Sequence, residues 1–189
     1  NELRLQLIGH YTLDCEDSVH SSLWADVAGR STLELTVMPV DLPNDLALLP
    51  VPFFDSRDVR QLALPIVLGR SPDAARLESA GVLASWFGAL AGYRGAKFDA
   101  SLQDLPATGN AVVLLQPGDT VAGLQTPTIE GPSVAMQTNP RDPNGKLLLV
   151  MGRDAKELKQ AAAALALGGD ALSGPQARIT RLETPRPRK

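Results

Sequence analysis

The sequence predicts an α/β fold: an open, mostly parallel sheet with helices on both faces, preceded by strands of an antiparallel region. Three observations lead to this prediction. Short apolar runs, each preceded by glycine, recur at 109–116, 131–138 and 145–152. Segments with the periodicity of amphipathic helices lie before and after these runs. The first 40 residues instead show the period-two alternation of a half-exposed sheet.

The N-terminal region contains two alternating segments, LRLQLIGHY and STLELTV, which predict two antiparallel strands. Between them lies a polar connection with one aromatic anchor, Trp24. Two strands cannot bury a core by themselves. We therefore expect this region either to need further strands or to lie against the second region.

The next segment, MPVDLPNDLALLPVPFFDSRD, contains four prolines, which remove backbone donors and disfavour helical dihedrals. This composition predicts a linker or an extended crossing strand. The following run, LALPIVL, is continuously apolar and predicts a strand buried on both faces, despite its internal proline.

A helix is predicted after this strand, with Ser71 as its N-cap, Pro72 at the first helical position and Asp73 in the first turn. It should run to about Ala91 and stop at Gly92. The apolar residues that recur at helical spacing predict a wide buried face; they are Leu77, Val82, Leu83, Trp86, Phe87 and Leu90.

A second helix is predicted from the cap Asp154 to about Leu167, with a Gly-Gly pair at its C-terminal end. The segment ARITRLE, 177–183, returns to period-two alternation. It is interpreted as an edge strand or as the start of another module.

Composition excludes several classes of protein. The formal charge of −3 and the scattered cations argue against a nucleic-acid partner. Cys15 is the single cysteine, so no disulfide can form within the chain. No apolar run approaches the roughly 20 residues that span a bilayer. Because the chain begins at Asn1 in an apparent strand, we expect it to be part of a longer protein.

Two strand-to-helix junctions are candidate anion sites, because open α/β sheets usually bind ligands beyond the carboxyl ends of their strands. The first junction, GRSPD, lacks a phosphate-binding glycine pattern, so Ser71 is interpreted as a helix cap. At the second, Asp154 caps the helix and would repel an anion, which leaves Arg153 as a surface charge.

The remaining candidates are weaker. The charges of Asp55, Arg57, Asp58 and Arg60 favour internal salt bridges or a turn over acid–base catalysis, since no nucleophile motif accompanies them. His10, Cys15 and His20 are spaced in a way that zinc tolerates, but no paired CxxC or HExxH motif supports a metal site.

Trp24 is a candidate for stacking on a sugar ring, although such a residue is more often a core anchor.

Three stretches together resemble the periplasmic B subunit of bacterial cellulose synthase, the BcsB family. They are LIGHYTLDCEDSVHSSLWADV, VPFFDSRDVRQLALPIVL, and GVLASWFGALAGYRGAKF followed by GNAVVLL. The resemblance extends through KLLLVMGRD and the alanine-rich helix to the terminal PRPRK. Their order and spacing match the family along nearly the whole chain.

The resemblance implies a domain plan. Residues 1–40 would be the closing strands of a jelly-roll domain similar to carbohydrate-binding modules, and 41–60 a proline-rich joint with Phe53 and Phe54 packed in its seam. Residues 61–184 would form a flavodoxin-like α/β domain, and 185–189 a linker to the next module. No cofactor is expected, because the Ser/Thr-rich loop that holds flavin phosphate is missing after the first strand.

The resemblance also implies a function. The chain would belong to a non-catalytic periplasmic subunit, anchored in the inner membrane by a C-terminal helix outside this segment. Its expected partners are the catalytic synthase subunit, the nascent β-1,4-glucan and further copies of itself, with Trp24 and Tyr11 as candidate carbohydrate contacts. The alternative is a nucleotide-binding α/β domain for cyclic di-GMP or flavin, although the RxxxR and [DN]xSxxG motifs of the known effector domain are missing.

Overall fold

The computed structural model describes residues 6, 20–21, 23–34, 36, 38, 40–168 and 171–182. The chain divides into two compact units, Asn1–Met38 and Pro39–Lys189. The second unit contains the α/β architecture and includes the segment 41–60 that the sequence assigns to a joint. Among the described residues, no helix is both long and apolar enough to cross a membrane.

The second unit is built on a sheet whose described strands have the order β4-β2-β5-β7-β6-β8. β2 (Ile66–Leu68) pairs in parallel with β4 (Ala100–Leu102) and β5 (Ala111–Leu115), and β5 pairs in parallel with β7 (Asp142–Met151). β6 (Ser133–Asn139) is antiparallel to β7 and to the edge strand β8 (Gln176–Arg178). The α/β class predicted from the sequence is confirmed, and the edge strand β8 overlaps the start of the predicted segment 177–183.

The apolar runs 131–138 and 145–152 form a β6–β7 hairpin, which is an antiparallel part of the mostly parallel sheet. Met136 pairs with Leu148 in an antiparallel register, and only Pro140 and Arg141 separate the two strands. A parallel pair needs a crossover of about a dozen residues or more. The short connection therefore permits only a hairpin.

The ribbon formed by β2 and β4 is extended at its amino end by a short parallel pair, β1 (Leu62–Ala63) with β3 (Ala96–Lys97). The backbone N–H of Leu64 bonds the carbonyl of Lys97 at 3.0 Å, and that of Ile66 bonds the carbonyl of Asp99 at 2.9 Å. Pro65 separates β1 from β2 because it cannot donate to the ladder.

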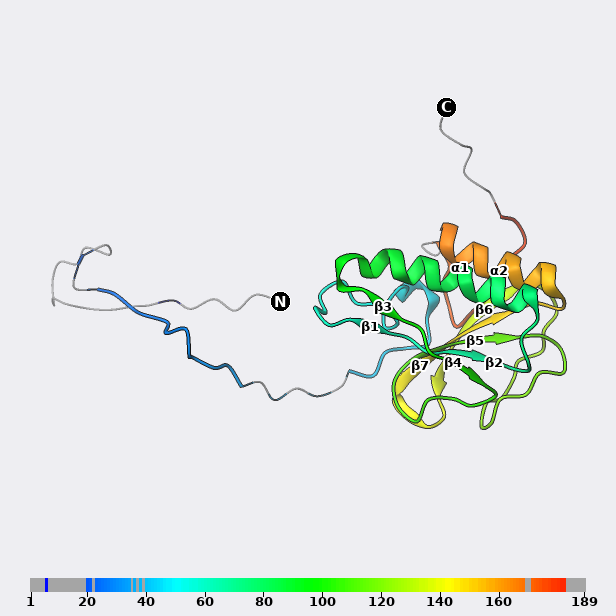
Figure 1. The fold of residues 1–189 in the computed structure, drawn as a ribbon, viewed down its shortest axis with the longest axis horizontal. Helices are drawn as coiled ribbons and strands as arrows, with labels where there is room; N and C mark the ends of the chain where they lie inside the picture. The colour runs from blue at the N-terminus through cyan, green and yellow to red at the C-terminus, as the bar shows by residue number, and fades with distance from the viewer. Residues whose placement is uncertain are drawn as a thin grey trace, which may run out of the picture. The chain divides into compact units, whose positions relative to one another are not determined.

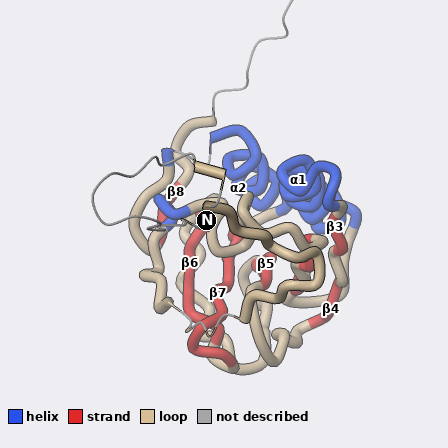
Figure 2. The backbone as a smooth tube through the Cα atoms, turned by 90° about the vertical axis from the view of Figure 1, so that its left-hand side faces the viewer, coloured by secondary structure: helices blue, strands red, loops and turns tan. Residues whose placement is uncertain are grey.

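Both helices lie on the same face of the sheet, so the prediction of helices on both faces is wrong. Figures 1 and 2 show α1 (Ala74–Ala91) and α2 (Ala155–Gly168) side by side above the strands. The opposite face is covered by loop residues, among them Leu105, Val121 and Ile129. The connections on that side, 103–110 and 116–132, are short or rich in Pro and Gly and form no helix.

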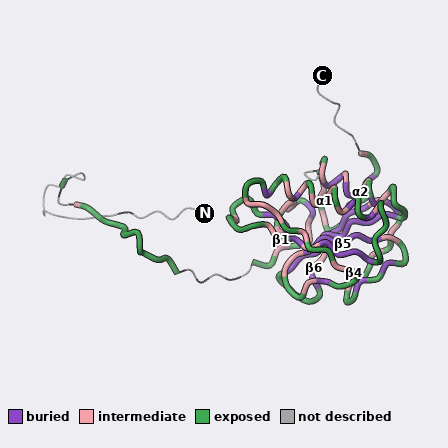
Figure 3. The backbone as a smooth tube through the Cα atoms, viewed as in Figure 1, coloured by how far each residue is buried: buried purple, intermediate pink, exposed green. Residues whose placement is uncertain are grey.

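The segment 41–60 packs as part of this unit. Leu46, Phe53 and Phe54 are buried in the cluster beneath the helices, and the ring of Phe53 lies 6.4 Å from that of Phe87 in α1. Figure 3 shows the buried backbone concentrated in the central strands. Phe53 and Phe54 therefore belong to the core of the α/β unit itself.

The caps explain where the helices begin. Asp73 caps α1 by accepting from the N–H of Arg76 at 2.8 Å, which corrects the assignment of Ser71 as the cap and of Pro72 as the first helical residue. Asp154 caps α2 as predicted, by accepting from the N–H of Glu157 at 2.9 Å. Gly92 ends α1 with a positive φ of 54°, also as predicted.

The buried face of α1 differs from the predicted one at its two ends. Leu83 and Phe87 are buried, whereas Leu77 and Leu90 are exposed. Arg76 and Ser79 are buried in their place.

In the first unit, no strand is assigned at the described positions of the predicted strand 31–37. Leu33 is 61% exposed there, which is consistent with too little apolar partner surface to hold a strand. The other predicted strand, LRLQLIGHY, lies outside the described residues apart from Gln6.

Candidate functional site

The carboxyl edge of the sheet is where an open α/β fold usually holds its ligand. β2 lies between β4 and β5, so the chain order reverses at this strand, and the loops after β2 and β5 meet there. These loops bring Arg70, Gln116 and Asp119 together with Arg76 from the first turn of α1.

The side chain of Asp119 occupies this position. Its Oδ2 lies 2.8 Å from Nη1 of Arg76 and accepts from the N–H of Gln116 at 2.9 Å, while its Oδ1 accepts from Arg70. Asp119 and Arg76 are both buried, whereas the side chain of Arg70 is half-exposed. Arg76 also donates from Nε to the side-chain oxygen of Gln116 at 2.9 Å. One carboxylate thus contacts two guanidinium groups, and the network keeps a net positive charge.

The backbone of Gly69 packs closely against the side chain of Asp119. A Cβ at position 69 would lie 2.4 Å from the Cβ of Asp119. An anion that took the place of the Asp119 side chain would have to displace a buried carboxylate from two arginines. Sequence reasoning missed this network, although one signal was present: Arg76 lies on the same helical stripe as the buried Leu83 and Phe87.

The second candidate anion site, at the start of α2, is also occupied by the protein's own groups. Arg153 donates to Glu157 in an i,i+4 ion pair, and the N–H of Arg153 bonds the same carboxylate at 2.9 Å. The guanidinium lowers the pKa of Glu157, and the carboxylate raises the pKa of Arg153. The assignments of Asp154 as a cap and Arg153 as a surface charge are confirmed.

The charge cluster at 55–60 forms turns and one ion pair, as predicted. The N–H of Arg57 bonds Oδ1 of Asp55 at 2.8 Å, and Nη2 of Arg60 lies 2.8 Å from Oδ2 of Asp58. Nε of Arg60 also donates to this carboxylate. The hydrogen bonds from Arg60 lower the pKa of Asp58 to about 2.

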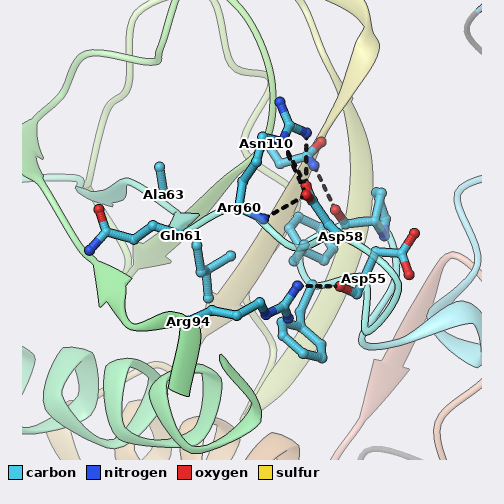
Figure 4. Close-up of a pocket in the computed structure, with 11 residues that line it drawn as sticks. Asp55, Asp58, Arg60, Gln61, Ala63, Arg94 and Asn110 are labelled. Atoms are coloured by element: carbon cyan, nitrogen blue, oxygen red, sulfur yellow. Dashed lines mark hydrogen bonds and ion pairs between the residues drawn. The ribbon is translucent and has the colours of Figure 1, made fainter. Parts of the chain in front are cut away.

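This cluster forms one wall of a pocket of about 320 Å³, shown in Figure 4. The pocket is lined by residues 52–55, 58, 60–63, 94 and 110. Leu62 and Ala63 form β1, Arg94 precedes β3, and Asn110 precedes β5. The pocket therefore lies at the amino ends of the parallel strands, at the opposite edge from Asp119.

Hydrogen bonds to the backbone hold the walls of this pocket. The Asn110 amide donates to the carbonyl of Pro52 at 2.8 Å and accepts from the N–H of Lys146 at 2.8 Å. Nη1 of Arg94 donates to the carbonyl of Asp55 at 3.0 Å, and its guanidinium carbon lies 4.6 Å from the centre of the Phe54 ring. Sequence reasoning did not select Arg94 or Asn110, which no local motif marks.

The other candidates are placed only in part. His10, Cys15 and Tyr11 lie outside the described residues, and the described residues contain no group of three potential metal ligands. Trp24 is 75% exposed, so it is not a core anchor in this structure.

Comparison with known proteins gives matches along the whole chain. Residues 45–179 match the family model described as the first FD domain of cellulose synthase BcsB, and residues 1–39 match the model of its first CBM domain. Proteins named "Cyclic di-GMP-binding protein" are 56% identical over 194 residues in Xanthomonas axonopodis pv. citri, 52% over 191 in Pseudomonas fluorescens and 37% over 190 in Escherichia coli K12. Each alignment covers 100% of the chain but only 24%, 25% and 24% of the relative. The chain thus spans about a quarter of these curated relatives.

Proposed function

The chain belongs to the BcsB family of cellulose synthase, and we propose that the protein containing it is a non-catalytic accessory subunit of the bacterial enzyme. In this proposal the subunit acts in the periplasm and is held at the inner membrane by a helix outside this segment. It supports the catalytic subunit and guides the nascent β-1,4-glucan away from the membrane. The catalytic subunit polymerises the sugar.

The observation that carries this proposal is the occupied carboxyl edge of the α/β unit. Asp119, buried against Arg76, fills the position at which related architectures bind a cofactor or nucleotide. The loops there are held by internal ion pairs, as suits a rigid support. The α/β unit is therefore proposed as a spacer that positions the glucan-contacting parts of the subunit.

The first unit is proposed to contact glucan. It matches a CBM model, and the indole of Trp24 is exposed, as stacking on the apolar face of a sugar requires. Tyr11 is proposed as a second contact. A surface that passes a moving polymer should bind it weakly at several points, since tight binding would halt movement.

Reconstitution tests the accessory role directly. The full-length subunit, the catalytic subunit and the complex of the two are supplied with UDP-glucose in lipid nanodiscs, and labelled glucan is measured. The accessory subunit alone should make no glucan, and the complex should be more active than the catalytic subunit alone. Equal activity with and without the accessory subunit would contradict the supporting role, and glucan made by the accessory subunit alone would contradict a non-catalytic one.

A second candidate function is nucleotide binding, which is favoured by the name "Cyclic di-GMP-binding protein" that the relatives carry. A nucleotide bound only by the folded protein stabilises it by about 2.7 kcal/mol at 100 times its Kd. This alternative predicts a saturable rise in the Tm of the full-length subunit with cyclic di-GMP. The accessory-subunit proposal predicts no rise.

A further inference from the structure

We propose that the pocket at the amino edge of the sheet, between the 52–63 segment and Arg94, is a glucan-binding subsite. Its ligand would be a neutral, hydroxyl-rich chain: a short stretch of β-linked glucose. This inference rests on the proposed function and extends it, because it places a sugar contact in the α/β unit.

Hydrogen bonds within the protein hold the walls of the pocket in place. Asn110 ties the 52–63 segment to β7 through the carbonyl of Pro52 and the N–H of Lys146. Arg94 ties the same segment to the end of α1 through the carbonyl of Asp55. Figure 4 shows Arg94 pointing toward Asp55 and Arg60 pointing toward Asp58. A preformed wall lowers the entropic cost of binding.

The charges that line the pocket balance. Asp55 and Asp58 supply two carboxylates, and Arg60 and Arg94 supply two guanidinium groups. Asp58 is already paired with Arg60. The two carboxylates would repel an anion such as a nucleotide phosphate, and the two arginines would repel a cation. The balance favours a neutral polar ligand.

The remaining hydrogen-bonding groups include both donors and acceptors. The Gln61 amide and Oδ2 of Asp55 have no hydrogen-bond partner among the described residues, and both residues are exposed. A sugar hydroxyl both donates and accepts, so it can bond either group and replace the water there. The nearby Phe53 and Phe54 are buried and leave little apolar surface, so an apolar peptide side chain would suit this pocket poorly.

Size and exposure indicate weak binding. About 320 Å³ lies at the lower end of ligand pockets, which span roughly 300–1,000 Å³, and the polar side chains remain in contact with solvent. This is the property required of one contact among several along a moving polymer.

Hydrogen exchange of the full-length subunit, measured by mass spectrometry with and without cellohexaose, tests the proposal. We expect cellohexaose to protect peptides covering 52–63 and 92–97, and the α-linked maltohexaose to protect them less. Gln61→Ala should weaken this protection by a factor of about 2 to 12 in apparent Kd, as expected for one lost hydrogen bond. The matched control is Gln125→Ala, an exposed glutamine outside the pocket, which should change nothing.

Two results would overturn the subsite. If cellohexaose protects the region around Trp24 but not 52–63, the subsite is wrong and the glucan-guiding function stands. If Gln61→Ala and Asp55→Ala both leave the protection of 52–63 unchanged, the ligand is not held by these groups. Loss of activity in the nanodisc assay is a separate outcome, so failure of the accessory role and failure of the subsite are distinguishable.

Discussion

The two edges of the same sheet use arginine–carboxylate pairs in opposite ways. At the carboxyl edge, Asp119 and Arg76 are buried and fill the space between the loops. At the amino edge, Asp58 and Arg60 are 36% and 84% exposed in their side chains and stand at the rim of an open pocket. The usual ligand position of an α/β fold is therefore structural in this protein, whereas the open polar pocket lies at the opposite edge of the sheet.

The largest expected loss of stability follows from removing the buried carboxylate of Asp119. Asp119→Ala leaves Arg76 buried without a counter-charge and should destabilise the chain by about 3–5 kcal/mol. Urea denaturation followed by circular dichroism measures the change. The matched control is Asp99→Ala, whose partner Lys97 lies 2.9 Å away in an exposed pair and whose loss should cost less than about 1 kcal/mol. Equal losses in the two variants would contradict a structural role for Asp119.

A smaller effect is expected from a pair of glycine substitutions. Gly69→Ala places a Cβ 2.4 Å from the Cβ of Asp119 and should destabilise the chain by about 1–3 kcal/mol. Gly81→Ala, on the exposed side of α1, meets no atom within 4 Å and should stabilise it by about 0.5–1 kcal/mol. Thermal denaturation of both variants shows whether each substitution raises or lowers the stability. If Gly69→Ala left the stability unchanged, the carboxyl edge would have space for an added Cβ beside Asp119.

The smallest effect concerns the exposed pair at the amino edge. Arg60→Ala should return the pKa of Asp58 from about 2 toward 3.8, because the guanidinium bonds that lower it are lost. Since the folded pKa is depressed, the contribution of the pair is present above pH 3.8 and is lost as the pH falls toward 2. An NMR titration of the Asp58 carboxyl carbon measures the shift, and stability at pH 7 should barely change. An unchanged pKa in the variant would show that the Arg60 guanidinium does not lower the pKa of Asp58.

Some local signals were interpreted correctly from the sequence, although the cap of α1 was placed at Ser71 and not at Asp73. Gly92 and Asp154 mark helix boundaries through the chemistry of single residues, and both were found. The hairpin of β6 and β7 was missed although only six residues, 139–144, separate the two apolar runs in the sequence. Both helices lie on one face because the connections on the other face form no helix. The Pro and Gly residues in 116–132 indicate this in the sequence, but they were not used in the prediction.

The pocket at the amino edge could not be predicted from local sequence signals. It brings Asn110 to Pro52 and Arg94 to Asp55, pairs that are 58 and 39 residues apart in the chain. No periodic pattern or short motif encodes such a contact. The ion pair at the carboxyl edge could not be predicted for the same reason, because Asp119 and Arg76 are 43 residues apart in the chain.

Calorimetric titration of the full-length subunit with cyclic di-GMP, on the wild type and on Arg70→Ala, tests whether the carboxyl edge of the sheet binds a nucleotide. Arg70 is the half-exposed arginine at the carboxyl edge and the first group that a phosphate would reach. A carboxyl edge filled by Asp119 predicts no saturable heat with either protein. Saturable binding to the wild type that is lost in Arg70→Ala would place a nucleotide at this edge and contradict the account.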